Sequence, residues 1–289
     1  MSISSSAVLV ELNISVWTAN KLDRDATDVV ISNNSANSDA VKVHKNLMAG
    51  TNKRKQIADF ASRTRLYHNQ NTLAWSDKGA RLLPTSLFMD YKTHMNAWRT
   101  KFDSMVDEFI ADYDILIQQA QSNLGNLFNP SDYPSKEELR SKFGFKLVFS
   151  PLPESGDFRL DIPNTDIAEL RKTYDAEYSD RLQSAMQDVW EKLHSMLIHM
   201  SDKLTDVEGA DEDDKATKKR YHDTLLTNAQ EMCGMLTHLN VTNDKKLEEA
   251  RRDLERTLMG VDIEDVREYP SKRKEVKAKV DAILSKFDW

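Results

Sequence analysis

Apolar residues recur every three or four positions along two long stretches of this 289-residue chain, and this spacing is typical of amphipathic helices. The first stretch covers residues 84–124, with Pro84 expected in the first turn, and its stripe is Leu87, Tyr91, Met95, Trp98, Phe102, Met105, Phe109, Tyr113, Leu116, Ala120 and Leu124. The second stretch has the stripe Ile167, Leu170, Tyr174, Tyr178, Leu182, Met186, Val189, Leu193, Leu197, Met200 and Leu204. About 40 residues make a helix about 60 Å long. We therefore predict two long helices that pack antiparallel and bury their stripes in a coiled-coil-like pair.

Between the two stretches, residues 145–162 alternate apolar and polar positions around a turn rich in Pro and Gly, which predicts a β-hairpin. Residues 8–16 alternate in the same way and predict a strand. Because an isolated hairpin is only marginally stable in water, we expect this strand to pair with it. The predicted fold class is mainly α: an elongated antiparallel bundle of long helices with a small β-hairpin or three-stranded sheet as its head.

The pattern divides the chain into two regions. Residues 1–207 hold the N-terminal strand, the long helix pair and the hairpin head, together with a helix expected from Asp39 to Leu47. An acidic loop around residues 208–214 interrupts the pattern, and residues 208–289 contain further amphipathic helices. We predict a C-terminal helical region from residue 208.

Composition and charge restrict the function classes. The chain carries 40 Lys and Arg against 47 Asp and Glu, a formal net charge of -7, so attraction of the whole chain to nucleic acid or an anionic membrane is not expected. Cys233 is the single cysteine, which excludes an intramolecular disulfide and fits a reducing compartment. The first residues lack the charged and apolar regions of a signal peptide. We expect a soluble protein without membrane contact.

One segment concentrates positive charge between residues 53 and 68. Its cations are interleaved with Phe60 and Tyr67, and they are Lys53, Arg54, Lys55, Arg63 and Arg65. Cations that follow a phosphate backbone, with aromatic rings that stack on bases, are typical of single-strand binding. A solvated helix face explains the same charges and is the favoured interpretation, because no recognition motif accompanies them.

The sequence shows no combination of residues that is typical of a catalytic or metal site. His194 and His199 are five residues apart, so a helix does not place both on one face as a metal pair requires. Cys233 lacks a CxxC context, and residues 211–214 lack the ligand spacing of a calcium loop. We expect no catalytic site, no metal and no cofactor.

Three segments resemble a family of uncharacterised proteins from tailed bacteriophages and proteobacteria: residues 11–23, 65–84 and 132–160. The similarity covers roughly the first 200 residues. The residues most characteristic of this similarity are Trp75, Gly79, Arg81, Pro84, Tyr133, Pro134, Pro151, Pro153, Asp157, Phe158 and Arg159. The family has no assigned activity, and its genes are often found near those for MoxR-type AAA+ ATPases and von Willebrand A-domain proteins. The resemblance implies an adaptor or substrate of such a system.

Long amphipathic helices without a reactive cluster favour a function in protein contacts, including self-association. The leading hypothesis is a non-enzymatic phage protein in the cytoplasm of the infected bacterial host, with an AAA+ ATPase as a candidate partner. One alternative is a nucleic-acid-binding protein that uses residues 53–68. Another is a structural component of the virion.

Overall fold

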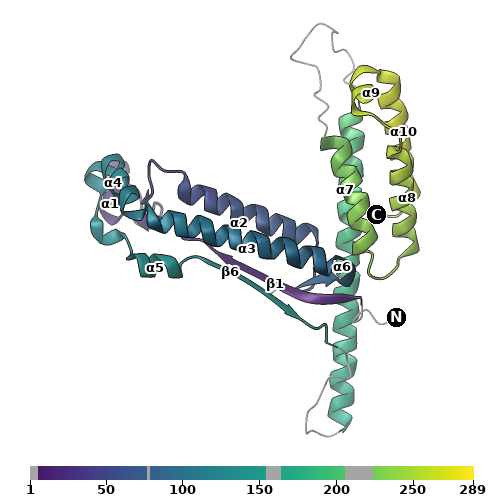
Figure 1. Cartoon of the computed structure of the whole chain (residues 1–289), viewed down its shortest axis with the longest axis horizontal. Coiled ribbons are helices and arrows are strands. Elements are labelled where there is room, and N and C mark those ends of the chain that lie inside the picture. The colour runs from purple at the N-terminus through teal and green to yellow at the C-terminus, as the bar shows by residue number, and fades with distance from the viewer. Residues whose placement is uncertain (1–5, 77–78, 154–163, 206–223) are drawn as a thin grey trace. The chain divides into compact units, whose positions relative to one another are not determined.

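The computed structural model describes residues 6–76, 79–153, 164–205 and 224–289. The chain is mainly helical with a small antiparallel sheet, as the sequence predicts. The strands are β1 (Ala7–Ser15), β2 (Asn20–Leu22), β3 (His44–Asn46), β4 (Leu73–Ala74), β5 (Arg81–Pro84) and β6 (Gly144–Ser150). The helices are α1 (Arg24–Asn34), α2 (Lys53–Gln70), α3 (Phe88–Ala111), α4 (Tyr113–Leu124), α5 (Lys136–Ser141), α6 (Asn164–Leu204), α7 (Thr224–Leu239), α8 (Lys245–Leu258), α9 (Ile263–Glu268) and α10 (Pro270–Lys286) (Figure 1).

These elements form two compact units, each built from separate parts of the chain. The C-terminal unit consists of Met1–Glu11, Asn69–Met89 and Phe149–Trp289, and the central unit consists of Leu12–His68 and Asp90–Val148. The predicted boundary between residues 207 and 208 lies outside the described residues. In the described part of the chain, we find no helix with the length and apolar content needed to cross a membrane.

The predicted N-terminal strand is confirmed as β1, which lies between β5 and β6 in the sheet order β4-β5-β1-β6. β6 corresponds to the first strand of the predicted hairpin, whereas the expected return strand, residues 158–162, lies outside the described residues. β4 and β5 were not predicted. β5 pairs antiparallel with β1, from Ala7 opposite Pro84 to Val10 opposite Arg81.

Pro84 is therefore not in the first turn of a helix, and that prediction is wrong. Its backbone is extended, with φ -58° and ψ 137°, and the long helix begins only at Phe88. Proline suits the end of a strand as well as the start of a helix because it has no N–H to donate. In the strand β5, which pairs with β1, Leu82 and Leu83 are both fully buried, and this burial favours the extended conformation.

The core of the central unit contains the predicted stripe of the first long helix. Phe102, Val106 and Phe109 of α3 pack with Ile57 and Phe60 of α2 in one buried cluster. α3 and α4 are separated only by Asp112, and the bonds from Asp112 N to Glu108 O and from Leu116 N to Asp112 O continue the helical pattern. The predicted capping box before α5 is also present, formed by Ser135 and Glu138.

The predicted helix from Asp39 to Leu47 is wrong, because this segment contains β3, which pairs antiparallel with β2. Contacts distant in sequence hold it extended. The Lys45 Nζ atom lies 2.7 Å from Asp132 Oδ2 and 3.3 Å from Asp23 Oδ2, and it donates to the Leu127 carbonyl at 2.9 Å. Asp23 in turn caps α1, an unpredicted helix, by accepting from the Ala26 N–H.

The core of the C-terminal unit surrounds the second half of α6. Val189, Leu193 and Leu197 of α6 are fully buried in a cluster with residues of α7, α8 and α10. α6 packs against α7, α10 and β4 within this unit. The predicted second long helix is present as the 41-residue α6, but the coiled-coil-like pair with residues 84–124 is not confirmed.

Candidate functional site

In the described part of the chain, the apolar stripe on the first half of α6 is only partly buried. Among the described residues of α6, the first buried side chain is Ala185, about twenty residues after the helix begins. Figure 1 shows this first half beyond the ends of α7, α8 and α10. Its stripe residues are half-buried or exposed, and we call them the α6 amino-terminal face: Ile167, Leu170, Tyr174 and Tyr178. Leu170 is 38% exposed.

Two contacts within the C-terminal unit fix the orientation of this face. The Tyr174 hydroxyl donates to the Pro153 carbonyl at 2.6 Å, and the Tyr178 ring meets the Trp75 ring edge to face, with centroids 5.2 Å apart. Trp75 is buried and belongs to the residues that carry the family resemblance. Tyr174 and Tyr178 are thus held by their own unit on one side and stay half-buried, while Leu170 is exposed.

Both signs of charge flank the α6 amino-terminal face. Arg171, Lys172 and Asp175 are exposed, and together with Ile167 and Ala168 they line an open groove of about 560 Å³. Glu177 forms an i,i+4 ion pair with Arg181 at 2.8 Å. A half-exposed apolar stripe with mixed charges at its edges has the composition of a helix that packs against another helix.

The predicted basic segment lies on α2 of the central unit, where most of its cations have internal roles. Arg65 Nη2 donates to the Ile14 carbonyl at 2.7 Å, Arg54 Nη1 donates to the Trp17 carbonyl at 3.5 Å, and Lys53 pairs with Asp112. Arg63 lies over the Phe60 ring, 5.7 Å from its centroid. Lys55 is exposed and has no partner in the described part of the chain. The five cations therefore do not act as one set.

An aromatic cluster lies between α2 and α3 beside this segment. Tyr67 stacks on His94 with centroids 4.3 Å apart, and Trp98 contacts Tyr67, His94 and Phe60 with centroids between 4.5 and 5.5 Å apart. Burial, with a smaller effect of the nearby Asp90 carboxylate, raises the pKa of Tyr67. Tyr67, His94 and Trp98 are only half-buried, so their edges are accessible. The sequence placed Phe60 and Tyr67 with the cations but missed their α3 partners.

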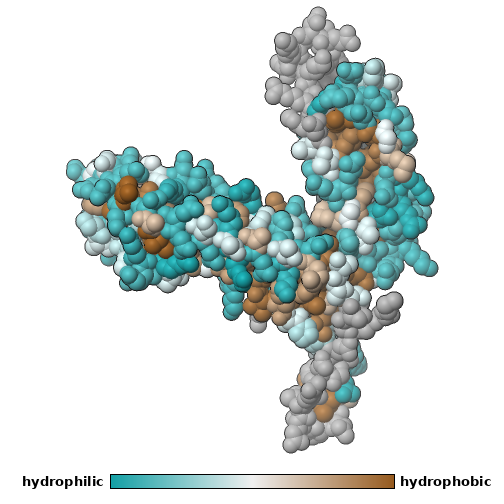
Figure 2. Space-filling view, in the orientation of Figure 1, coloured by the Kyte–Doolittle hydropathy of each residue, from teal (hydrophilic) through white to brown (hydrophobic). Residues whose placement is uncertain are grey.

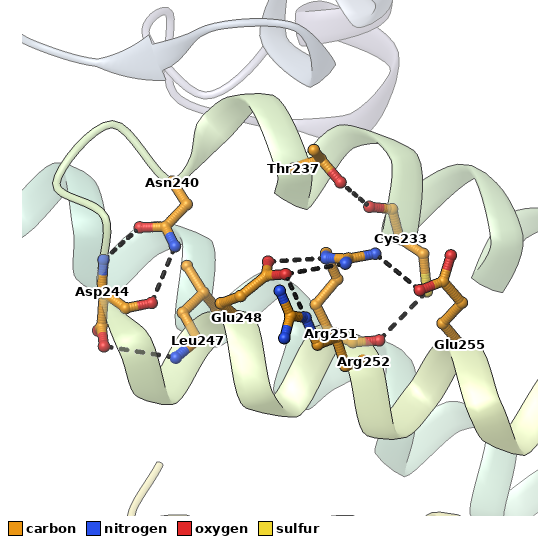
Figure 3. Close-up of polar contacts among 9 residues, drawn as sticks. All are labelled: Cys233, Thr237, Asn240, Asp244, Leu247, Glu248, Arg251, Arg252 and Glu255. Carbon is orange, nitrogen blue, oxygen red and sulfur yellow. Dashed lines mark hydrogen bonds and ion pairs between the residues drawn. The ribbon is translucent and has the colours of Figure 1, made fainter.

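A polar network covers one side of α8 (Figure 3), and Figure 2 shows hydrophilic residues over the visible surface of this helix. Arg251 holds Glu248 in a bidentate pair, with N–O distances of 2.8 and 2.9 Å, and it also reaches Glu255 at 3.1 Å. Arg252 donates a third bond to Glu248 at 2.7 Å. The hydrogen bond from Arg251 is the main reason that the pKa of Glu248 falls to about 2, and the same pair raises the pKa of Arg251.

The turn from α7 to α8 borders this network. Asp244 caps α8 and accepts from the Trp190 indole at 3.1 Å, while Asn240 exchanges two hydrogen bonds with the Asp244 backbone. An open groove of about 590 Å³ lies here, lined by acidic and basic side chains, and Lys286 of α10 pairs across it with Glu249 and Asp253. Charges that compensate one another in this way stabilise helix packing and leave no net attraction for an ion.

In the described part of the chain, the single cysteine has the surroundings of a core residue and not those of a reactive group. Cys233 is buried on α7, and desolvation raises the pKa of its thiol to about 11, which disfavours the nucleophilic thiolate. Among the described residues, no group of three His, Cys, Asp or Glu side chains is placed to hold a metal ion.

The residues that carry the family resemblance have local structural roles where they are described. Arg81 donates to the Thr72 side chain at 2.6 Å and to its carbonyl at 2.9 Å, and Gly79 has φ 94° in the turn before β5. Tyr133 donates to the Leu47 carbonyl at 2.9 Å, and Pro134 follows it directly. Asp157, Phe158 and Arg159 lie outside the described residues.

Comparison of the chain with family models, curated proteins and solved structures finds no match. The resemblance to the phage and proteobacterial family therefore stays a prediction.

Proposed function

We propose that this chain is a non-enzymatic binding protein that acts through protein contacts made by the α6 amino-terminal face. One observation carries the proposal. The apolar stripe runs from Ile167 to Leu204 of the 41-residue helix α6, but among its described residues full burial begins only at Ala185.

Most of the stability of a helix in a protein comes from packing of its apolar face, because isolated helices are marginal in water. The second half of α6 has that packing, whereas Leu170 and its neighbours remain accessible. A partner that covers this face would gain apolar burial along several turns, as in helix-in-groove and coiled-coil recognition.

The family resemblance supplies a candidate partner. A MoxR-type AAA+ ATPase with its von Willebrand A-domain protein would use the chain as adaptor or substrate, in the cytoplasm of an infected bacterial host. A chain built from two compact units suits an adaptor, since one unit can bind while the other is held elsewhere.

Co-elution of the purified chain with a purified MoxR-type ATPase and A-domain protein tests this proposal. We expect Leu170→Lys to abolish co-elution, because a charge would be placed in the apolar contact. Ile198→Lys is the matched control, since Ile198 is also exposed on α6 but lies beside the packed half. No co-elution of the unmodified chain would contradict the ATPase as partner, and equal loss with both variants would contradict the role of the α6 amino-terminal face.

Nucleic-acid binding is the second candidate, favoured by the exposed cation Arg63 over the Phe60 ring, which contacts Trp98, and by the exposed Lys55 on the same helix. The central unit that carries them has 16 Lys and Arg against 14 Asp and Glu, whereas the C-terminal unit has 24 against 33. A gel shift at low salt that is lost in the Lys55→Glu/Arg63→Glu variant would support it. Arg65 is unsuitable for this test because its guanidinium holds the Ile14 carbonyl.

A further inference from the structure

We propose that the α6 amino-terminal face binds a second copy of this chain, with the two α6 helices antiparallel and crossing at Tyr174. The inference rests on the proposed function, since it names the occupant of the same face. It is carried by the positions of charge along the edge of the stripe.

Arg171 and Asp175 lie on the same edge of the stripe. On a helix with about 100° between successive residues, Arg171 is about 60° and Asp175 about 100° from Tyr174, in the same direction. Arg171 comes three residues before Tyr174 and Asp175 one residue after it. A two-fold axis at Tyr174 would bring the same edges of two antiparallel helices together.

In that arrangement each Arg171 would lie opposite the Asp175 of the other copy. The two Cα positions differ by two residues along the axis, about 3 Å, which the long arginine side chain spans easily. The two-fold axis repeats the pair, so one register would form two ion pairs between copies. Parallel helices would bring opposite edges of the stripe together, and Arg171 would not lie opposite Asp175.

The apolar positions match in the same register. Leu170 of one copy would lie level with Tyr178 of the other, and the two Tyr174 side chains would meet at the axis. Aliphatic and aromatic side chains pack well across such a contact. The contact spans about 22 Å of helix, which places it at the weak end of specific interfaces, and we expect a dissociation constant of about micromolar size.

Charge reversal at the two positions gives the decisive test, measured by sedimentation equilibrium over a concentration series in low salt. Arg171→Glu and Asp175→Arg should each weaken self-association about tenfold, because each replaces two attractive pairs by two repulsive ones. An equimolar mixture of the two variants should associate as tightly as the unmodified chain, since both mixed pairs are again opposite in charge. Lys203→Glu, at the far end of α6, is the control and should change nothing.

Disulfide formation tests the orientation. Tyr174→Cys should cross-link to itself, whereas Leu170→Cys should cross-link efficiently only when mixed with Tyr178→Cys. Parallel helices would instead let Leu170→Cys cross-link to itself and Tyr178→Cys cross-link to itself, without mixing of the two variants. Cys233 is buried in its own unit and does not compete in these measurements.

The proposed dimer would be overturned if the chain stayed monomeric at up to about 100 µM, far above the expected dissociation constant. It would also be overturned if the mixture of the two variants associated no more tightly than each variant alone. If self-association fails while Leu170→Lys still abolishes co-elution with the ATPase, the proposed function stands and only the homodimer is rejected. If self-association holds and co-elution fails, the occupant of the face is a second copy and the ATPase is rejected.

Discussion

Glu248 of α8 provides a direct test of the polar network in the C-terminal unit. Its carboxylate accepts three charge-assisted hydrogen bonds, two from Arg251 and one from Arg252. These bonds favour the ionised form and lower the pKa of Glu248 from 4.5 to about 2. The Glu248→Gln variant keeps the shape of the side chain but removes the charge.

The expected loss of stability follows from the pKa change and from exposure. A shift of this size corresponds to roughly 3 kcal/mol for a fully desolvated group. The Glu248 side chain is 32% exposed, and solvent screening reduces its contribution to about 1 kcal/mol, comparable with a few helical ion pairs.

The pH dependence has a definite sign. Between about pH 4.5 and about pH 2, unfolded chains bind a proton at Glu248 that the native protein does not. Acidification through this range therefore favours unfolding, and the stabilisation by Glu248 is lost. The free energy of unfolding should differ most between the unmodified chain and Glu248→Gln near neutral pH. This difference should decrease as the pH falls through this range.

Urea unfolding followed by circular dichroism, at neutral pH and at several pH values below 4.5, measures this difference. Hydrogen exchange of α8 peptides locates the effect in the C-terminal unit. Glu231→Gln is the matched control, because Glu231 is an exposed carboxylate on the neighbouring helix α7. A difference that stays constant with pH, or an equal loss in Glu231→Gln, would refute the reasoning.

Three further predictions concern buried groups. Leu193→Ala should lower the free energy of unfolding by about 2–5 kcal/mol in urea denaturation, because Leu193 is fully buried. Ile198→Ala on the same helix should lower it by less than about 1 kcal/mol, because Ile198 is exposed. Similar losses in the two variants would contradict the packing of α6. Cys233 should resist iodoacetamide in the native protein at neutral pH and react after unfolding, and rapid native labelling would show that the thiol is not held in the core. Tyr91→Phe should cost about 1–2 kcal/mol, because it removes the 2.6 Å hydrogen bond between Tyr91 Oη and His68 Nδ1, and an unchanged thermal midpoint would refute this.

The sequence predicted local structure best where one periodicity was strong and long. The stripe of α6 specified a single helix, and the alternation in residues 8–16 specified β1. The capping box at Ser135 and Glu138 fixed the start of α5 through bonds between near neighbours. In these elements the deciding interactions lie within a few residues of one another.

Predictions failed where distant residues decided the conformation. Pro84 is compatible with a helix start or a strand end, and the choice depends on pairing with Ala7, far away in the sequence. Lys45 lies in β3 because Asp23 and Asp132 hold it. The sequence identified the cations of the basic segment on α2, but it could not predict their contacts. Only the fold shows that Arg65 donates to a backbone carbonyl and that Lys55 is exposed.

The sequence alone determined that α6 is one amphipathic helix, because helical periodicity needs no information beyond the residues themselves. Only the tertiary structure decided which part of that helix is covered. An apolar stripe specifies that a face can be buried, but it names neither the partner nor the length of the contact. The C-terminal unit buries α6 from Ala185 onward and leaves Leu170 accessible, and this division identified the candidate site.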